Sequence, residues 1–211
     1  MPLCYTCNLN GTEVSVWKIT EGEDELCALA GLDYAVEHRR FSSAGRRLEW
    51  LAVRALLMQV YTTNELCYSP AGKPSLVSRS GYISISHTTG YAVVAFSPVH
   101  EVGVDAELRS RHVGAVARRF MRDEELHGIP PECVNDAKLL RWVASEALFK
   151  LVGDLGGNYR DNIVLSAFPC GESGHFTLAL RGLPGHGDDC YGASFLFVGD
   201  LLLVLCCKQI T

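Results

Sequence analysis

The chain has 211 residues and a net charge of −5, with acidic and basic residues interspersed. That length allows one sizeable domain or two compact halves, and the acidic balance argues against non-specific nucleic-acid binding, which usually needs a basic excess. The nine cysteines are scattered and no apolar leader follows Met1, which favours a reduced, cytoplasmic chain. The most apolar run, from Phe195 to Cys207, is too short to span a membrane.

The N-terminal part of the chain predicts a strand and two helices. Residues 13–19 alternate as a strand does. Thr20 with Glu23 forms a capping box for a short helix. Ser42-Ser43 can cap a longer helix over 45–61, whose apolar residues form one stripe.

Cys4-x-x-Cys7 resembles half a zinc site or a redox pair in its spacing. No second pair of cysteines or histidines with ligand spacing follows it. We therefore expect two small residues in a terminal strand.

Three further segments, 81–87, 91–96 and 102–107, predict an antiparallel meander. Alternation on the last strand puts Gly103, Asp105 and Glu107 on one face. Two neighbouring carboxylates repel each other unless a cation or a proton lies between them, and Mg²⁺ prefers such oxygen ligands. On this segment alone, a solvated acidic strand remains the alternative.

The second half repeats the same elements. Asn135-Asp136 can cap a helix that runs to about Val152. Strands are expected over 162–168, 176–180, 191–198 and 201–207, with Gly199-Asp200 as the turn of the last hairpin. We therefore predict an α+β fold of two similar halves, 1–101 and 102–211, each an antiparallel sheet packed with a long helix and related by a pseudo-twofold.

On the second long helix, Trp142, Glu146 and Lys150 are spaced four residues apart and so share one face. In isolation, Glu146 and Lys150 would form an exposed ion pair of little energetic value. Together with the carboxylates of the earlier strand, they indicate a functional site instead.

Together these segments resemble the 4'-phosphopantetheinyl transferase superfamily. The resemblance rests on the order and spacing of several motifs rather than on any one of them. They are Gly72-Lys73-Pro74, Ser86-His87, Arg46-x-x-Glu49-Trp50-Leu51-Ala52-x-Arg54, Gly103-Val104-Asp105-x-Glu107, Arg119-Phe120 with Glu125, and Trp142-x-x-x-Glu146-Ala147-x-x-Lys150.

The two-half length resembles the pseudodimeric, surfactin-synthetase-activating type. The resemblance implies a holo-[acyl-carrier-protein] synthase activity. A serine of an acyl or peptidyl carrier protein in fatty-acid, polyketide or peptide synthesis attacks coenzyme A and receives 4'-phosphopantetheine, while 3',5'-ADP leaves. The resemblance also implies that the N-terminal half binds coenzyme A and that the C-terminal half binds the metal and carries the catalytic residues.

The resemblance implies a role for each motif residue. Mg²⁺ would be held by Asp105, Glu107 and Glu146, and Glu146 would also accept the serine proton, with Lys150 stabilising the leaving phosphate. Asp105, Glu146 and Lys150 are thus the expected catalytic residues. The expected coenzyme A ligands are Lys73, Ser86, His87, Arg46, Arg54 and Lys150. Glu125 is either near the metal or part of a solvated acidic run.

A monomer is expected, because two fused halves already supply both parts of the site. Its partner would be a carrier protein, whose helices are typically acidic, and neither nucleic acid nor membrane is implied. A basic patch could dock the carrier or could simply be a solvated helix. It consists of Arg109, Arg111, Arg118, Arg119 and Arg122.

One residue departs from the family pattern. The family usually has a lysine just before the helical glutamate, whereas this chain has Ser145. We expect lower activity unless Lys138 or Arg141 compensates, and Ser145→Lys should then keep or raise the rate.

Two other functions are compatible with the same residues. One is a catalytically weakened module that binds coenzyme A or a carrier protein. The other is an unrelated Mg²⁺-dependent phosphohydrolase. The full set of carboxylates with Lys150 argues against the first, and Lys73 with Ser86-His87 argues against the second.

Overall fold

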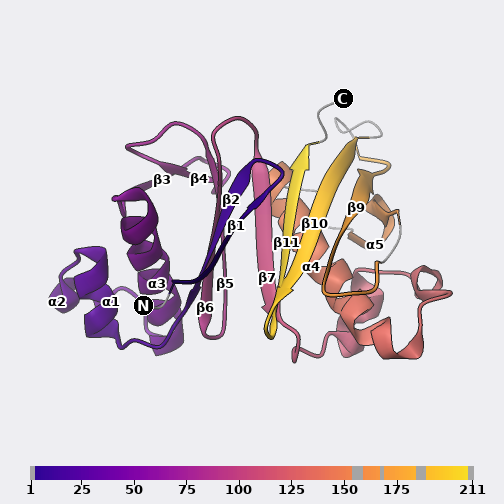
Figure 1. The fold of residues 1–211 in the computed structure, drawn as a ribbon, viewed down its shortest axis with the longest axis horizontal. Coiled ribbons are helices and arrows are strands. Elements are labelled where there is room, and N and C mark those ends of the chain that lie inside the picture. Colours follow the sequence, from indigo (N-terminus) through magenta and orange to yellow (C-terminus); the bar gives the residue numbers. More distant parts are fainter. Residues whose placement is uncertain (1–2, 154–158, 167–168, 184–188, 209–211) are drawn as a thin grey trace. The chain divides into compact units, whose positions relative to one another are not determined.

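A computed structural model describes residues 3–153, 159–166, 169–183 and 189–208. The chain forms two compact units, Met1–His100 and Glu101–Thr211. Each described unit contains an antiparallel sheet and helices (Figure 1), so the predicted α+β class is confirmed. The pseudo-twofold relation between the halves stays a prediction.

The sheet of unit 1 has the strand order β1-β2-β6-β5. Its strands are β1 (Leu3–Leu9), β2 (Thr12–Lys18), β5 (Tyr82–Thr88) and β6 (Tyr91–Ser97). A short hairpin, β3 (Leu66–Tyr68) and β4 (Pro74–Leu76), forms a separate two-stranded sheet, in which β4 packs against β5. The expected turn at Gly72-Lys73 joins its two strands, with Gly72 at φ 80°.

The helices of unit 1 are α1 (Glu23–Ala30), α2 (Tyr34–Glu37) and α3 (Ala44–Tyr61), and they lie on one face of the sheet (Figure 1). Helix α3 packs on β2, β5 and β6 because its apolar stripe, including Leu51 and Leu56, is buried. Ser43 caps α3 as expected. The cap of α1 differs from the prediction: Glu25, not Glu23, accepts the N–H of the N-cap residue, which is Gly22 and not Thr20.

Unit 2 contains a sheet of order β7-β11-β10-β9-β8. Its strands are β7 (Val102–Leu108), β8 (Ile163–Leu165), β9 (Ser173–Leu180), β10 (Cys190–Val198) and β11 (Leu201–Lys208). The hairpin of β10 and β11 turns at Gly199-Asp200 as predicted. Residues 167–168, at the end of one predicted strand, lie outside the described residues.

The predicted three-stranded meander is wrong at its third strand. Strand β5 pairs with β6, but β6 pairs on its other edge with β2, so that edge is already occupied. Strand β7 pairs with β11 in a different sheet. Consecutive strands of similar pattern therefore ended in separate sheets, because the pairing partner of β7 comes from the far end of the sequence.

The long helix of unit 2 is α4 (Val134–Val152), which packs on β7 and β11. Its predicted apolar stripe is buried: Leu139, Val143, Ala147 and Leu151 are at most 3% exposed. The helix begins two residues earlier than predicted, with Cys133 at the N-cap position. The described part of the unit also contains three short 3-10 helices, η1 (Gly114–Arg119), η2 (Asp123–Leu126) and η3 (Pro131–Cys133), and the short helix α5 (Tyr159–Asn162). No described helix is long and apolar enough to cross a membrane.

Candidate functional site

The candidate site of unit 2 begins with a close approach of α4 to β7. A Cβ atom added at Gly103 would lie 2.0 Å from the carbonyl oxygen of Ala147 and 2.7 Å from the backbone nitrogen of Leu151. Only a glycine allows the backbones of strand and helix to lie this close. Since Asp105 is on the same strand face as Gly103, the approach brings its carboxylate to the helix.

Lys150 of α4 donates a hydrogen bond to Asp105 Oδ1 over 2.8 Å. The side chains of Lys150 and Asp105 are 27% and 13% exposed, so the pair is shielded but still open to solvent. An ion pair therefore joins the strand to the helix, and each sequence motif supplies one of its two residues.

Glu107 is only 6% exposed and its carboxylate is paired with Arg111, four residues on. Its Oε1 also accepts the backbone N–H of Leu108 over 3.0 Å. The alternative of a solvated acidic strand is therefore wrong for Glu107. Arg111, which the sequence assigned to a docking patch, is instead the counter-ion of one of the proposed metal ligands.

Glu146 lies on α4 one turn before Lys150 and is the third carboxylate of the group. Burial raises the pKa of the Glu146 carboxyl, and the nearby charge of Asp105 raises it further. Lys150 and Arg111 act in the opposite direction, but they do not cancel the shift. The carboxyls of Glu146 and Asp105 are thus close enough to repel each other, so a proton or a cation is favoured between them.

The donor chemistry of Asp105, Glu107 and Glu146 suits a hard cation such as Mg²⁺, because all three offer only oxygen. Among the described residues, however, no group of three or more histidine, cysteine or acidic side chains is arranged to hold a metal ion. Asp105 and Glu107 are paired with Lys150 and Arg111 instead. A metal ion would therefore compete with these two cations for the carboxylates.

Ser145 lies in a different environment from Glu146. It is 0% exposed, and its hydroxyl donates to the carbonyl of Arg141 over 2.8 Å and accepts from Arg141 Nη1. Position 145 therefore faces the interior of unit 2, where a lysine would have no solvent and would meet a second cation.

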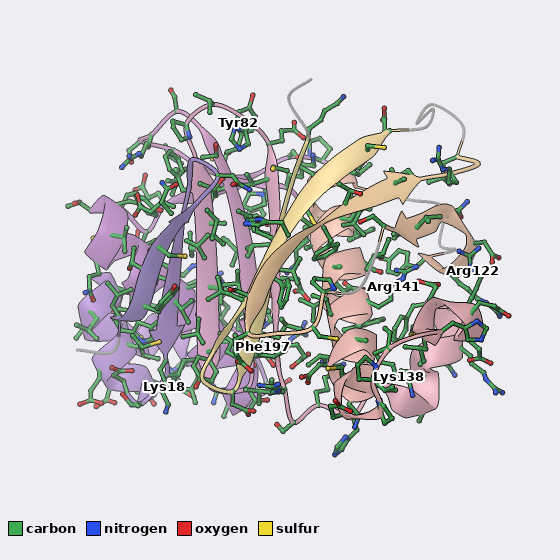
Figure 2. All side chains as sticks on the ribbon, turned by 45° about the vertical axis from the view of Figure 1, so that its right-hand side comes forward. Lys18, Tyr82, Arg122, Lys138, Arg141 and Phe197 are labelled. Atoms are coloured by element: carbon green, nitrogen blue, oxygen red, sulfur yellow. The ribbon has the colours of Figure 1, made fainter. Side chains whose placement is uncertain are left out.

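Arg141 is also fully buried and cannot supply charge at the surface. Its Nε donates to Glu125 over 3.0 Å, and its Nη2 donates to the carbonyl oxygens of Tyr159 and Ile163. Figure 2 labels Arg141 beside the middle of α4, with Lys138 nearer the start of that helix. The expectation that Arg141 compensates for the missing lysine is wrong, because every nitrogen of its guanidinium is engaged inside the unit.

Glu125 is not part of a solvated acidic run, because its side chain is only 12% exposed. Its Oε1 accepts the backbone N–H of Arg122 over 2.8 Å, and its Oε2 is the counter-ion of Arg141. It thus holds η2 to α4. Trp142 packs nearby on Phe120, with ring centroids 5.1 Å apart.

In unit 1, His87 of β5 reaches α3. Its Nδ1 lies 3.0 Å from Glu49 Oε2, while the neighbouring Ser86 is only 2% exposed. Sequence reasoning quoted Glu49 within a motif but gave it no role. Its place directly before Trp50 in that motif was the available signal.

Arg54 and Lys73 also lie in unit 1. The guanidinium of Arg54 stacks 3.7 Å from the ring centroid of Trp50. Burial lowers the pKa of Arg54, and a hydrogen bond with Tyr68 partly offsets that effect. Tyr68 pairs with Pro74 in the hairpin whose turn carries Lys73. Arg54 thus connects α3 to the hairpin that carries Lys73, whereas Arg46 stands exposed in the first turn of α3.

The arginines of the proposed docking patch differ in their availability. Arg109 is held by Asp136 and Glu172, and Arg122 lies 3.7 Å from Glu125. Arg118 is 83% exposed and lies 3.5 Å from Asp123, which is itself 70% exposed. Arg119 is exposed as well. The open part of the patch is therefore Arg118 and Arg119 on η1.

Cys4 and Cys7 lie on β1, the edge strand of unit 1. An offset of three residues along a strand puts their side chains on opposite faces. The terminal-strand prediction is confirmed, and this geometry does not suit a shared zinc ion.

Comparison with known proteins supports one resemblance. No family model matches the chain. It is 32% identical over 97 residues to a Synechocystis sp. protein provisionally named 4'-phosphopantetheinyl transferase slr0495. The chain is similar to a phosphopantetheinyl transferase. The match covers 42% of this chain and 39% of the relative, so the chain spans about two fifths of the protein that it matches.

Proposed function

We propose that this protein is a 4'-phosphopantetheinyl transferase of the holo-[acyl-carrier-protein] synthase type. The observation that carries the proposal is the meeting of Asp105 on β7 with Glu146 and Lys150 on α4. Two separate sequence motifs supply these residues, and Gly103 allows them to come together. The similarity to the Synechocystis protein supports the same reaction class.

In the proposed reaction, the hydroxyl oxygen of a carrier-protein serine attacks the β-phosphorus of coenzyme A. A new phosphoester bond forms to the serine, and the bond from that phosphorus to the bridging pyrophosphate oxygen breaks. The products are the phosphopantetheinylated carrier and 3',5'-ADP, and the serine proton is transferred to a base.

Glu146 is the proposed base. Its raised pKa brings the carboxyl closer to neutral pH, which makes it a better proton acceptor than an ordinary glutamate. Lys150 is positioned one turn further on, where its ammonium can neutralise charge on the leaving oxygen. Asp105 orients Lys150 through their hydrogen bond.

Mg²⁺ is proposed as the cofactor, with Asp105, Glu107 and Glu146 as its ligands. When bound, the ion would neutralise the phosphate oxygens of coenzyme A. Lys150 and Arg111 neutralise two of these carboxylates, Asp105 and Glu107, in its absence. We therefore expect metal affinity to rise when Arg111 is replaced by a neutral residue.

The nucleotide end of coenzyme A is assigned to unit 1. Lys73, Arg46 and Arg54 offer positive charge for its phosphates, while His87 and Ser86 offer hydrogen-bond donors. Glu49 would orient the His87 ring through its Nδ1 atom. Among the assigned cations, Arg46 is exposed at the helix start and so is free to reach a phosphate.

The carrier protein is assigned to the open arginines of η1. Arg118→Glu should raise the Michaelis constant for an acidic carrier several-fold, with little change for coenzyme A, because it reverses an exposed charge. Steady-state kinetics with each substrate varied in turn would measure this. An unchanged carrier constant would remove η1 from the docking surface.

One experiment tests the transferase proposal itself. The protein is incubated with Mg²⁺, coenzyme A and an apo carrier protein, and the carrier is weighed by mass spectrometry. A phosphopantetheine increment that is lost in Glu146→Gln but kept in the exposed control Glu124→Gln is the expected result. Retained coenzyme A without an increment would identify a binding module, and phosphate release alone would identify a hydrolase.

A further inference from the structure

Two thiols from separate segments of unit 2 lie at one hollow of the surface. Cys133 is the N-cap residue of α4, and Cys170 belongs to the segment between β8 and β9. Both side chains line the same hollow, together with Asp136 and Phe197. Phe197, near the end of β10, is labelled in Figure 2. Both cysteines are free thiols, and Cys170 is exposed.

Arg109 independently holds the same two segments together. Its guanidinium donates to Asp136, in the first turn of α4, over 2.5 and 3.1 Å. It also donates to Glu172, just after Cys170, over 3.1 Å. The guanidinium lies over the ring of Phe197 at 4.2 Å, and the backbone N–H of Phe197 donates to the carbonyl of Glu172 over 2.7 Å. The hollow is therefore a fixed junction of α4, β10 and the segment that carries Cys170.

The ionisation of each thiol depends on the other. A hydrogen bond with Cys170, assisted by desolvation, raises the pKa of Cys133 to about 11. Cys133 is also the less exposed of the two thiols. The exposed Cys170 is the sulfur that an external reagent can reach.

We propose that Cys133 and Cys170 form a reversible disulfide that ties the start of α4 to the segment between β8 and β9. This inference goes beyond the transferase reaction and does not depend on it. Its co-reactant is a low-molecular-weight disulfide such as oxidised glutathione.

The exchange proceeds in two balanced steps. The thiolate of Cys170 attacks one sulfur of the glutathione disulfide, whose S–S bond breaks, and one glutathione thiolate leaves. Cys133 then loses its proton and attacks the Cys170 sulfur of the mixed disulfide, which releases the second glutathione. Two cysteine thiols are oxidised, one disulfide is reduced, and the two protons pass to the glutathione thiolates.

The bond would act on the helix that carries Glu146 and Lys150. It closes a loop of about 37 residues, which restricts the unfolded chain more than the folded one. Because Arg109 already holds the two segments in place, the folded state needs little rearrangement. We expect the oxidised protein to melt roughly 4–10 °C higher than the reduced protein.

The test uses the full chain treated with oxidised glutathione and then desalted. The peptides that carry Cys133 and Cys170 should together lose about 2 Da and carry no glutathione adduct, since two thiol hydrogens are lost; adducts on the exposed Cys4, Cys67 and Cys190 do not bear on this pair. A peptide map without reduction should contain one linked pair, Cys133 with Cys170. Dithiothreitol should reverse both the mass change and the rise in melting temperature.

Three single variants separate this disulfide from general oxidation. Cys133→Ser and Cys170→Ser should abolish the linked peptide and the rise in melting temperature. Cys67→Ser, at an exposed thiol of β3 in unit 1, should keep both. Glutathione adducts on Cys133 and Cys170 without a linked peptide, or an unchanged melting temperature after linkage, would overturn the proposal.

Discussion

Helix α4 carries two charged clusters that differ in how fully their charges are compensated. The buried cluster is Arg141, Ser145 and Glu125, in which each guanidinium nitrogen has an acceptor. The strand-facing cluster is Asp105, Glu146 and Lys150, with two carboxylates and one ammonium. The buried cluster is satisfied within the protein, whereas the strand-facing cluster retains repulsion that a ligand could relieve.

This difference follows from the geometry of one helix. Positions 141 and 145 share one face, and positions 146 and 150 share another. The inner face needs every polar group paired, because an unpaired buried charge is costly. The face that carries positions 146 and 150 can leave charges unbalanced, because solvent screens them in the free protein. Perturbed carboxyls of this kind are typical of functional sites.

The largest expected effect is on the buried cluster. Ser145→Lys puts a second cation beside Arg141 at a position that is 0% exposed. We now expect a loss of about 4 kcal/mol in the free energy of unfolding, and not the maintained or raised activity that the family pattern suggests. Urea denaturation measures the loss, and Ala115→Lys at an exposed position of η1 is the control. Equal stabilities of the two variants would place position 145 at the surface.

Gly103→Ala should have the next largest effect, because it separates the two elements on which the strand-facing cluster depends. The added methyl would overlap the backbone of Ala147 and Leu151. We expect a loss of about 2–3 kcal/mol in unfolding free energy and a fall in transfer rate larger than the fraction unfolded explains. Gly114→Ala, where a Cβ meets nothing within 4 Å, is the matched control. A fully active Gly103→Ala would show that the close approach is dispensable.

A double-mutant cycle measures the attraction within the strand-facing cluster. Asp105→Asn, Lys150→Met and their combination should give a coupling energy of about 1 kcal/mol, since the pair is partly shielded. The exposed pair Arg118 and Asp123, 3.5 Å apart, should give a coupling near zero. Identical couplings for the two pairs would mean that burial against β7 adds nothing to the attraction.

The smallest effect is the relief of repulsion at Glu146. Its carboxyl has a raised pKa in the folded protein, so the charged form destabilises the fold above that pKa. Below the unfolded value of 4.5 both states hold the proton and the penalty disappears. Glu146→Gln should therefore raise the melting temperature by about 1–2 °C at pH 7.5, a small value because solvent screens the group.

The same variant should show no gain near pH 4, where Glu146 is already protonated. Differential scanning fluorimetry at both pH values, in a chelator, measures the difference without metal. Glu124→Gln, at an exposed site of η2, is the control and should show no such pH dependence. A gain that is equal at both pH values would assign the effect to packing rather than to charge.

The local part of the fold was predictable from sequence. Periodicity located α3 and α4, the cap at Ser43 located the start of α3, and the Gly199-Asp200 pair located the last hairpin. Sheet partners were not predictable in this way, because β7 pairs with a strand from the other end of unit 2. Alternation fixes which face a residue takes, but it does not fix which strand lies beside it.

The site was predictable in part for a similar reason. The spacing of Glu146 and Lys150 and the alternation at Asp105 placed them on defined faces, and β7 with α4 then brings them together. Two side-chain partners were missed, although Arg111 stands four residues after Glu107 and Arg141 stands four residues before Ser145. The family pattern indicates that Ser145 replaces the family's usual lysine, whereas its complete burial shows that position 145 belongs to the interior of unit 2.

The close approach at Gly103 also has a consequence for the alignment of the helix on the strand. One missing side chain leaves a notch in β7, which the backbone of α4 at Ala147 and Leu151 occupies. A slide by one helical turn, about 5.4 Å, would replace these two residues at the notch and separate Lys150 from Asp105. The distance in sequence between β7 and α4 is then free to vary, because the alignment of Asp105 with Lys150 is set by contact and not by the length of the connection.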